Sequence, residues 1–135
     1  IRDILDKDKE KRDSITYFIL QPNIATKELR EYLYENNFEI IDERLIKKDE
    51  KIYEIIYAKK GKSHITKDVY YEIGEKLILN KDPLLKEFIN NKIEKSEKIL
   101  EELEDIKTER TEDRYKELTE EIIKLKGVLI DIEGN

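Results

Sequence analysis

Hydrophobic residues in the first third of the chain change their spacing between two neighbouring segments. Residues 16–20 form an apolar run without alternation, which is typical of a strand covered on both faces, as in a parallel sheet. The run ends at Pro22, which cannot donate a hydrogen bond to a neighbouring strand, and Asn23 is a good helix N-cap. Residues 24–36 then place their apolar side chains on one helical face, so we predict a strand followed by a helix.

Two segments rich in Ile, Tyr and Phe follow this helix, at 38–46 and 52–59. The polar link 47–51 joins them, and the pattern predicts an antiparallel β-hairpin. A buried parallel strand needs neighbours on both edges, and crossover connections normally supply them. The hairpin alone does not meet this need, so we expect an amino-terminal portion of the sheet to lie outside this sequence.

The spacing is helical throughout the second half. Thr66 can cap a helix that runs to about Asn80, and Asp82-Pro83 can start a longer one. Apolar residues spaced by three and four then predict two helices in an antiparallel coiled-coil hairpin. The predicted seams are Leu85, Ile89, Ile93, Ser96, Leu100, Leu103 and Ile106, and then Tyr115, Leu118, Ile122, Leu125, Leu129 and Ile132. With the shift in composition at Gly61, this pattern predicts two domains, 1–63 and 64–135.

Charge and composition narrow the class of protein. The formal net charge is −6, and the whole excess lies in residues 64–135, which carry 13 basic and 19 acidic residues. This balance argues against an indiscriminate nucleic-acid binder, although it leaves room for local basic patches. The chain has no Cys, so neither a disulfide framework nor a thiolate zinc site can form, and a reducing compartment is compatible. No apolar run approaches the roughly 20 residues that span a bilayer, so we expect no membrane contact.

Signatures of cofactor binding and catalysis are missing from the sequence. The four glycines lie far apart and form neither a GxGxxG fingerprint nor a P-loop. His64 is the single histidine, so no histidine metal cluster and no Ser-His-Asp triad can form. We therefore expect no metal. The 33 acidic residues make carboxylate pairs by chance, so the catalytic residues stay unassigned.

The segment Gln21-Pro22-Asn23 is the most informative candidate site. It follows a predicted buried strand, and ligands of open α/β sheets bind at the carboxyl ends of strands. Its two side-chain amides can donate and accept hydrogen bonds, as the Watson–Crick edge of adenine requires. The alternative interpretation is a turn in which Asn23 only caps the next helix.

Several blocks of the sequence resemble the bacterial tRNA (adenine-22-N1)-methyltransferases. An LILQPN-type strand end appears at Phe18–Asn23, and an LR-x-(W/Y)-L helix at Leu29–Leu33. The blocks NxFEIxDExL and KIYEII-A-KG appear in order at Asn37–Leu45 and Lys51–Gly61. The start IRDIL resembles the helix that follows the family's glycine-rich AGMGG turn. Residues of a later FGP-x-LL-KE segment also match, although Phe-Gly-Pro itself is replaced by Ile-Gly-Glu: Gly74, Leu77, Asn80, Pro83 and Leu84.

The resemblance implies a fold: an α/β carboxyl-terminal part of a class I methyltransferase (Rossmann-like) sheet plus an all-α antiparallel coiled-coil hairpin. In the family's strand order 3-2-1-4-5-7-6, residues 16–20 would be the fifth strand. The hairpin 38–59 would supply strands 6 and 7, with the last strand antiparallel. The motifs that bind S-adenosylmethionine would lie upstream of this sequence.

The resemblance also implies a function, the methylation of adenine N1 in tRNA by a cytoplasmic enzyme. Adenine N1 is itself a nucleophilic lone pair, so the reaction needs orientation and desolvation more than a base. Gln21, Pro22 and Asn23 would contact the substrate, and Lys95 and Lys98, which share a helix face, would contact tRNA. Two alternatives stay open: a coiled-coil interaction module without activity, and a class I methyltransferase with another substrate. The oligomeric state is not predicted.

Overall fold

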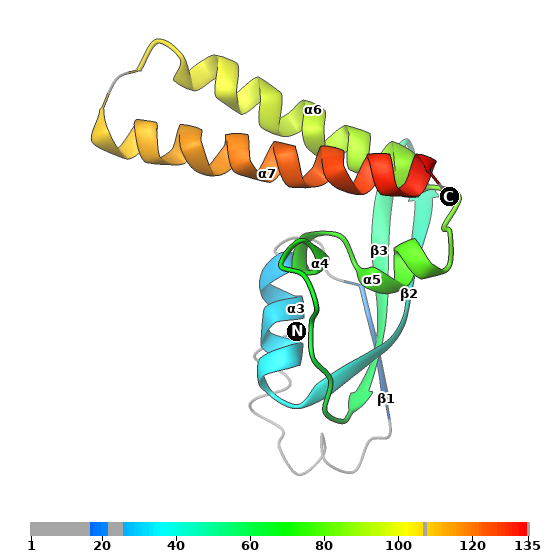
Figure 1. The fold of residues 1–135 in the computed structure, drawn as a ribbon. Helices are drawn as coiled ribbons and strands as arrows, with labels where there is room; N and C mark the ends of the chain where they lie inside the picture. Colours follow the sequence, from blue (N-terminus) through cyan, green and yellow to red (C-terminus); the bar gives the residue numbers. More distant parts are fainter. Residues whose placement is uncertain (1–16, 22–25, 107, 135) are drawn as a thin grey trace. The chain divides into compact units, whose positions relative to one another are not determined.

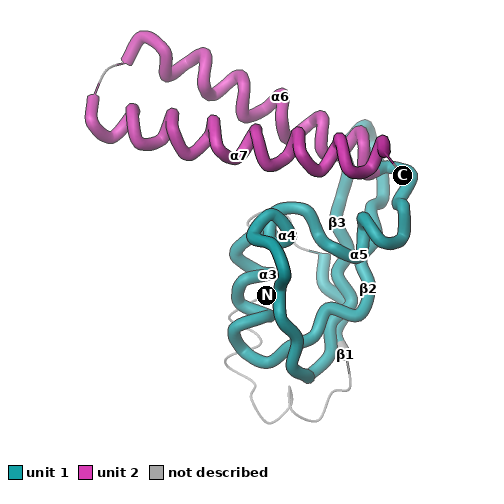
Figure 2. The backbone as a smooth tube through the Cα atoms, in the orientation of Figure 1, with its two compact units in different colours: residues 1–84 teal, residues 85–135 magenta. Residues whose placement is uncertain are grey.

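A computed structural model describes residues 17–21, 26–106 and 108–134 of the chain. The chain separates into two compact units, residues 1–84 and 85–135 (Figure 2). The domain boundary expected after residue 63 stays a prediction. In chain order the elements are β1 (Tyr17–Leu20), α3 (Thr26–Glu35), β2 (Phe38–Lys48), β3 (Lys51–Lys60), α4 (Val69–Glu72), α5 (Glu75–Leu79), α6 (Leu85–Leu103) and α7 (Glu109–Glu133), as labelled in Figure 1. No helix among the described residues is both long enough and apolar enough to cross a membrane.

The first unit is built on a three-stranded sheet in the order β1-β3-β2. Both pairings are antiparallel, with Phe18 opposite Ala58 in one and Leu45 opposite Glu54 in the other. This order matches the 5-7-6 end of the sheet that the resemblance implies. The expected hairpin is therefore present, and its second strand lies between the first strand of the unit and the other half of the hairpin.

One face of this sheet is covered by α3. Leu29 and Leu33 of α3 pack with Leu20, Ile40 and Ile56 of the three strands in a single buried cluster. Phe18 and Phe38 extend this cluster, with their rings edge to face and their centroids 5.6 Å apart. The core of the first unit therefore lies between this helix and one face of the sheet.

The prediction that residues 16–20 form a strand covered on both faces is wrong for the part that the structure describes. Leu20 is buried under α3, but the neighbouring Ile19 points to the other face and is 61% exposed. Successive side chains of a strand alternate between the two faces of its sheet. Within the described residues α3 covers only one of these faces, and Ile19 lies on the other.

The observed bounds of the helix α3 lie within those that the sequence predicted. The helix was expected over 24–36 and is observed from Thr26 to Glu35. Asn37 has a φ of 61°, and asparagine tolerates this left-handed conformation better than most residues, so it ends the helix. The predicted N-cap, Asn23, and the predicted helix end at 1–5 lie outside the described residues.

The hairpin turn is shorter than the sequence suggested. The strands extend to Lys48 and from Lys51, which leaves only Asp49 and Glu50 between them. Both turn residues have positive φ, 51° and 66°, as in the type I′ turn that suits the twist of a two-residue hairpin. The usual Asn-Gly signal of such a turn is missing, so the polar link was read as five residues long.

The single helix predicted over 66–80 is wrong, because the structure has two short helices, α4 and α5. Ile73 between them is extended, with φ −119° and ψ 110°, and Gly74 follows it. A Cβ on Gly74 would lie 2.2 Å from both carboxylate oxygens of Glu43, so a side chain is excluded there. The break lets this part of the chain lie against that carboxylate, which a continuous helix would not permit.

The second unit is the predicted helical hairpin, formed by α6 and α7 (Figure 1). Its seam agrees with the prediction at most positions, since the buried residues include Leu85, Ile89, Ile93, Ser96, Leu118, Ile122 and Leu125. The seam shifts near the end of α7, where Val128 is buried and Leu129 is only half-buried. At the tip, Ile106 and Tyr115 were expected in the seam but are exposed.

Candidate functional site

The predicted substrate-contacting segment is only partly described. Gln21 directly follows the last residue of β1, and its side chain is exposed. Pro22 and Asn23 lie outside the described residues. The observed position of Gln21 fits the expected strand end, and its contact with a substrate stays a prediction.

The two lysines predicted to contact tRNA are on α6. Lys95 and Lys98 are both exposed, and their spacing of three residues places them on one side of the helix. They belong to the second compact unit, whereas Gln21 belongs to the first. The contact of Lys95 and Lys98 with tRNA stays a prediction.

The most heavily buried polar group in the described residues is a cluster centred on Arg30 of α3. The Nε of this arginine donates to Glu43 of β2 over 2.8 Å, and one terminal nitrogen donates to Glu54 of β3 over 2.8 Å. The other terminal nitrogen donates to the backbone carbonyls of Tyr71 and Glu72, at 3.1 and 3.3 Å. One guanidinium thus joins the helix, two strands and α4.

The local structure explains why these charged side chains point inward. On β3, Glu54 shares its face with the buried residues Ile56 and Ala58 at intervals of two. On β2 the register shifts between Ile40 and Asp42, so that the inward positions move from even to odd numbers, and Glu43 points into the unit. A regular strand would have placed Glu43 on the opposite face.

Burial and mutual attraction act in opposite directions on this cluster. Burial alone lowers the pKa of Arg30, but the charges of Glu43 and Glu54 outweigh it and raise that pKa above its ordinary value. Burial raises the pKa of Glu43, and the guanidinium of Arg30 limits the rise. Because Arg30 is completely buried and donates to four oxygens, the cluster has no open face for a substrate, and we assign it a structural role.

Sequence reasoning missed this cluster because it treated all acidic pairs as equivalent. The signal that could have revealed it was a charge at a position where the pattern requires an apolar residue. Arg30 is adjacent to Leu29 on the packed face of α3, and Glu54 continues the inward series of β3. All three charged residues also lie within the blocks that carry the family resemblance.

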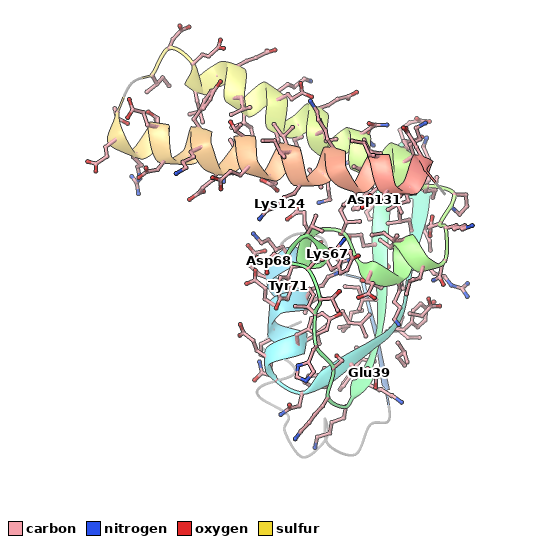
Figure 3. All side chains as sticks on the ribbon, in the orientation of Figure 1. Glu39, Lys67, Asp68, Tyr71, Lys124 and Asp131 are labelled. Atoms are coloured by element: carbon pink, nitrogen blue, oxygen red, sulfur yellow. The ribbon has the colours of Figure 1, made fainter. Side chains whose placement is uncertain are left out.

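Aromatic residues of α3 and α4 lie beside the cluster, since Arg30 donates to the carbonyl of Tyr71, which Figure 3 labels. The rings of Tyr34 and Tyr71 meet edge to face, with centroids 5.8 Å apart. Burial, with a further contribution from the charge of Glu43, raises the pKa of the Tyr34 hydroxyl. Lys67 places its ammonium group 6.0 Å from the ring centroid of Tyr70. The Tyr34–Tyr71 contact holds α4 against α3, and none of these side chains is a nucleophile or base aimed at an open site.

The chain's glycines do not fit the cradle that holds S-adenosylmethionine in Rossmann-like folds, where glycines let the backbone approach the ligand closely. The space beside Gly74 is filled by Glu43, and a Cβ on Gly61 would lie 3.0 Å from the carboxylate of Glu39. Both glycines therefore serve contacts within the unit. Among the described residues, no three His, Cys, Asp or Glu side chains are grouped as a metal site would require.

The order of the strands, the one-sided cover by α3 and the helical hairpin that follows define a portion of a Rossmann-superfamily methyltransferase fold. Residues 1–127 match the family model of the tRNA (adenine(22)-N(1))-methyltransferases. The chain belongs to this family.

Individual relatives agree with this assignment. The chain is 28% identical to the tRNA (adenine(22)-N(1))-methyltransferase of Bacillus subtilis (strain 168), over 96% of its own length and 57% of the relative's. The crystal structure of the B. subtilis M1A22 tRNA methyltransferase matches with a TM-score of 0.80 at 28% identity, over 93% of this chain and 56% of that one. A Rossmann-superfamily protein from Streptococcus agalactiae matches with a TM-score of 0.81 at 30% identity, over 94% and 53%. The chain thus spans about half the length of its relatives.

Proposed function

We propose that this chain forms the carboxyl-terminal part of a cytoplasmic enzyme that transfers a methyl group from S-adenosylmethionine to N1 of an adenine in tRNA. The observation that carries the proposal is the family match over residues 1–127, together with a sheet whose strand order is that of the end of a methyltransferase domain. The M. capricolum relative was solved with S-adenosyl-homocysteine, the product of the donor. Since the chain's own glycines do not fit the donor, an amino-terminal half would bind it.

Gln21, Pro22 and Asn23 would orient the adenine in this enzyme. Gln21 is exposed at the carboxyl end of β1, the edge at which Rossmann-like sheets bind their ligands. An amide there can accept from the exocyclic N6 amino group of adenine and donate to the ring nitrogen N7, which leaves the N1 lone pair free. Because N1 carries its own lone pair, the site has to position the base and does not have to remove a proton.

Lys95 and Lys98 would contact the phosphates of the tRNA from the helical hairpin. Both are exposed on one side of α6, and phosphate contacts need no base recognition. Replacing both by alanine in the complete enzyme should weaken tRNA binding and reduce its salt dependence. If the salt dependence of tRNA binding stayed the same in this variant, Lys95 and Lys98 would not contact the tRNA phosphates.

The test of the function is methylation of tRNA by the complete enzyme, in which this chain is joined to its amino-terminal half. Transfer of a labelled methyl group should occur, and the modified adenine should block reverse transcription, because N1 lies on the pairing edge. A tRNA in which guanine replaces the target adenine is the control. Methylation at another atom, or none with a folded enzyme, would refute the proposal.

Gln21→Ala in the complete enzyme should lower turnover by about 10–100-fold, the scale of a lost positioning hydrogen bond. Gln21→Glu is a matched variant of the same shape that cannot donate, and we expect it to be impaired as well. Turnover equal to that of the unmodified enzyme in both variants would remove Gln21 from the site.

A further inference from the structure

Residues 74–84 lie along the outer edge of β2, and we call this segment the β2 latch. It begins at the close approach of Gly74 to the Glu43 carboxylate, where the backbone N–H of Lys76 also donates to Glu43 Oε2 over 3.1 Å. The next inward side chain, Leu77, is completely buried. The latch is thus fixed at its first end by the same glutamate that binds Arg30.

A second contact lies in the middle of the latch. The side-chain amide of Asn80 donates to Asp42 Oδ1 over 2.7 Å, and the backbone N–H of Glu43 donates to the same oxygen over 2.9 Å. Burial acts to raise the pKa of the Asp42 carboxyl group, but these hydrogen bonds and the nearby Arg44 together outweigh it and lower that pKa. The pair joins a β2 side chain directly to the end of α5.

The third contact is made by Asp82. One of its carboxylate oxygens accepts from the backbone N–H of Leu45 in β2 over 3.0 Å, and the other accepts from the N–H of Leu84 over 2.9 Å. β2 is an edge strand in the sheet that the described residues form, so its outward N–H groups have no partner strand there. The side chain of Asp82 therefore gives the edge N–H of Leu45 a hydrogen-bond partner and also holds Leu84, the last residue before α6.

A strained turn brings Asp82 to this position. After α5, Lys81 has a φ of 52°, its N–H donates to Ile78, and the N–H of Asp82 donates to Leu77. These two bonds form a Schellman motif, which normally has glycine at the left-handed position. A lysine there costs on the order of 1 kcal/mol, so the contacts of the latch must hold the turn in place.

We propose that Asp82 is a positioning residue: through the β2 latch it fixes the point at which the chain enters the helical hairpin, so that tRNA bound by the hairpin is presented correctly to the methyl-transfer site. This inference rests on the proposed function for its tRNA part. The latch itself is defined by contacts within the first unit. It also gives a physical reason for the late family-like segment, in which Gly74 and Asn80 are two of the matching residues.

The latch can be tested on this chain without any enzyme assay. Because the chain has no Cys, Glu35→Cys and Glu101→Cys would carry two spin labels at exposed positions, one in each unit. Adding Asp82→Ala should broaden the distribution of distances between the labels, while circular dichroism shows that both units remain folded. Asp113→Ala, at an exposed position on α7, is the matched control and should leave the distribution unchanged. An unchanged distribution with Asp82→Ala would overturn the proposal.

Exchanging the side chains of Asp42 and Asn80 distinguishes the loss of a latch contact from a general loss of stability. Asn80→Asp alone brings two carboxylates to the place of a 2.7 Å hydrogen bond and should broaden the distribution. Adding Asp42→Asn restores one donor and one acceptor, so the distribution should narrow again. If the double variant gave a distance distribution as broad as that of Asn80→Asp alone, this pair would have no role in the latch.

In the complete enzyme, Asp82→Ala should raise the Michaelis constant for tRNA up to about tenfold, the scale of one or two hydrogen bonds, and leave the dissociation constant of the donor unchanged. A loss of stability alone would change both in proportion to the folded fraction. If the enzyme methylates no tRNA, the proposed function fails while the spin-label result still decides the latch. A broadened distribution with an unchanged Michaelis constant would overturn the positioning role.

Discussion

The two compact units are stabilised in different ways. In the first unit, Arg30, Glu43 and Glu54 come from three elements and form a buried charged cluster beside the apolar core. In the second, α6 and α7 meet through an apolar seam, and the only buried polar residue among those described there is Ser96. The seam repeats a local pattern along each helix, whereas the cluster depends on residues up to 24 positions apart.

This difference determines how each unit should respond to substitution. A charge left without its partner in a buried site costs more than the pair contributed, because its desolvation is no longer compensated. An apolar seam loses only the contacts of the residue that is removed, together with the cost of the cavity. The first unit should therefore be sensitive at a few positions, and the second moderately sensitive at many.

The largest effect is expected for Arg30→Ala. It leaves two buried carboxylates without their donor, and we expect a loss of about 4 kcal/mol in the free energy of unfolding. Urea unfolding followed by circular dichroism would measure it. Arg44→Ala, which removes an arginine that is 67% exposed and 3.6 Å from Asp42, is the control and should change little. Equal effects of the two variants would mean that the buried cluster does not stabilise the unit.

A cavity in the seam should have the next largest effect. Leu125 is completely buried, and Leu125→Ala should cost about 3 kcal/mol, as leucine truncations in cores do. Ile130, which is 69% exposed on the same helix, gives the matched control, and Ile130→Ala should be nearly neutral. If Leu125→Ala were as harmless as its control, the hairpin would not be held by this seam.

Gly74→Ala should cost about 2 kcal/mol through overpacking. The new methyl group would overlap both oxygens of Glu43, which is held by Arg30 and cannot easily move. Combining Gly74→Ala with Glu43→Ala should remove the overlap, so that the double variant is little worse than Glu43→Ala alone. Additive losses in thermal unfolding would show that the two residues do not interfere with each other.

The smallest effect should be a gain in stability. Gly127 lies inside α7, and no atom lies within 4 Å of the Cβ that an alanine would add. Gly127→Ala should therefore stabilise the second unit by about 0.5–1 kcal/mol, the difference in helix propensity. No close approach of a neighbouring atom therefore requires a glycine at this position. A loss of stability would mean that the added methyl group meets an atom that the structure places elsewhere.

The sequence predicted the elements whose signal is local. The apolar run before Gln21, the hairpin strands and the two long helices follow from spacing alone, and each is observed. Features that depend on distant residues were not accessible in the same way. The helix breaks at Gly74 because the carboxylate of Glu43, 31 positions earlier in the chain, fills the space beside it. Glu43 points inward because of a bulge in β2 that no residue type in the sequence indicates.

The position of Gln21 could be predicted from local signals, whereas its contact with a substrate stays a prediction. Gln21 stands at the end of β1, as expected, because a strand followed by proline is a strong local signal. Asp82 was read only as the start of a helix, since its contact with Leu45 joins positions 37 residues apart. Single-sequence periodicity carries no information on such a pairing.

The bulge after Ile40 also has a consequence for the alignment of β2 with β3. If β2 paired without it, the alternation would continue through Asp42 to Arg44, and Arg44 would face the guanidinium of Arg30 inside the unit. Glu43 would then turn to the opposite face, so that Arg30 lost its bond to that carboxylate. Only the bulged alignment gives Arg30 a second carboxylate partner, so unbulged pairing would leave its buried guanidinium less well compensated.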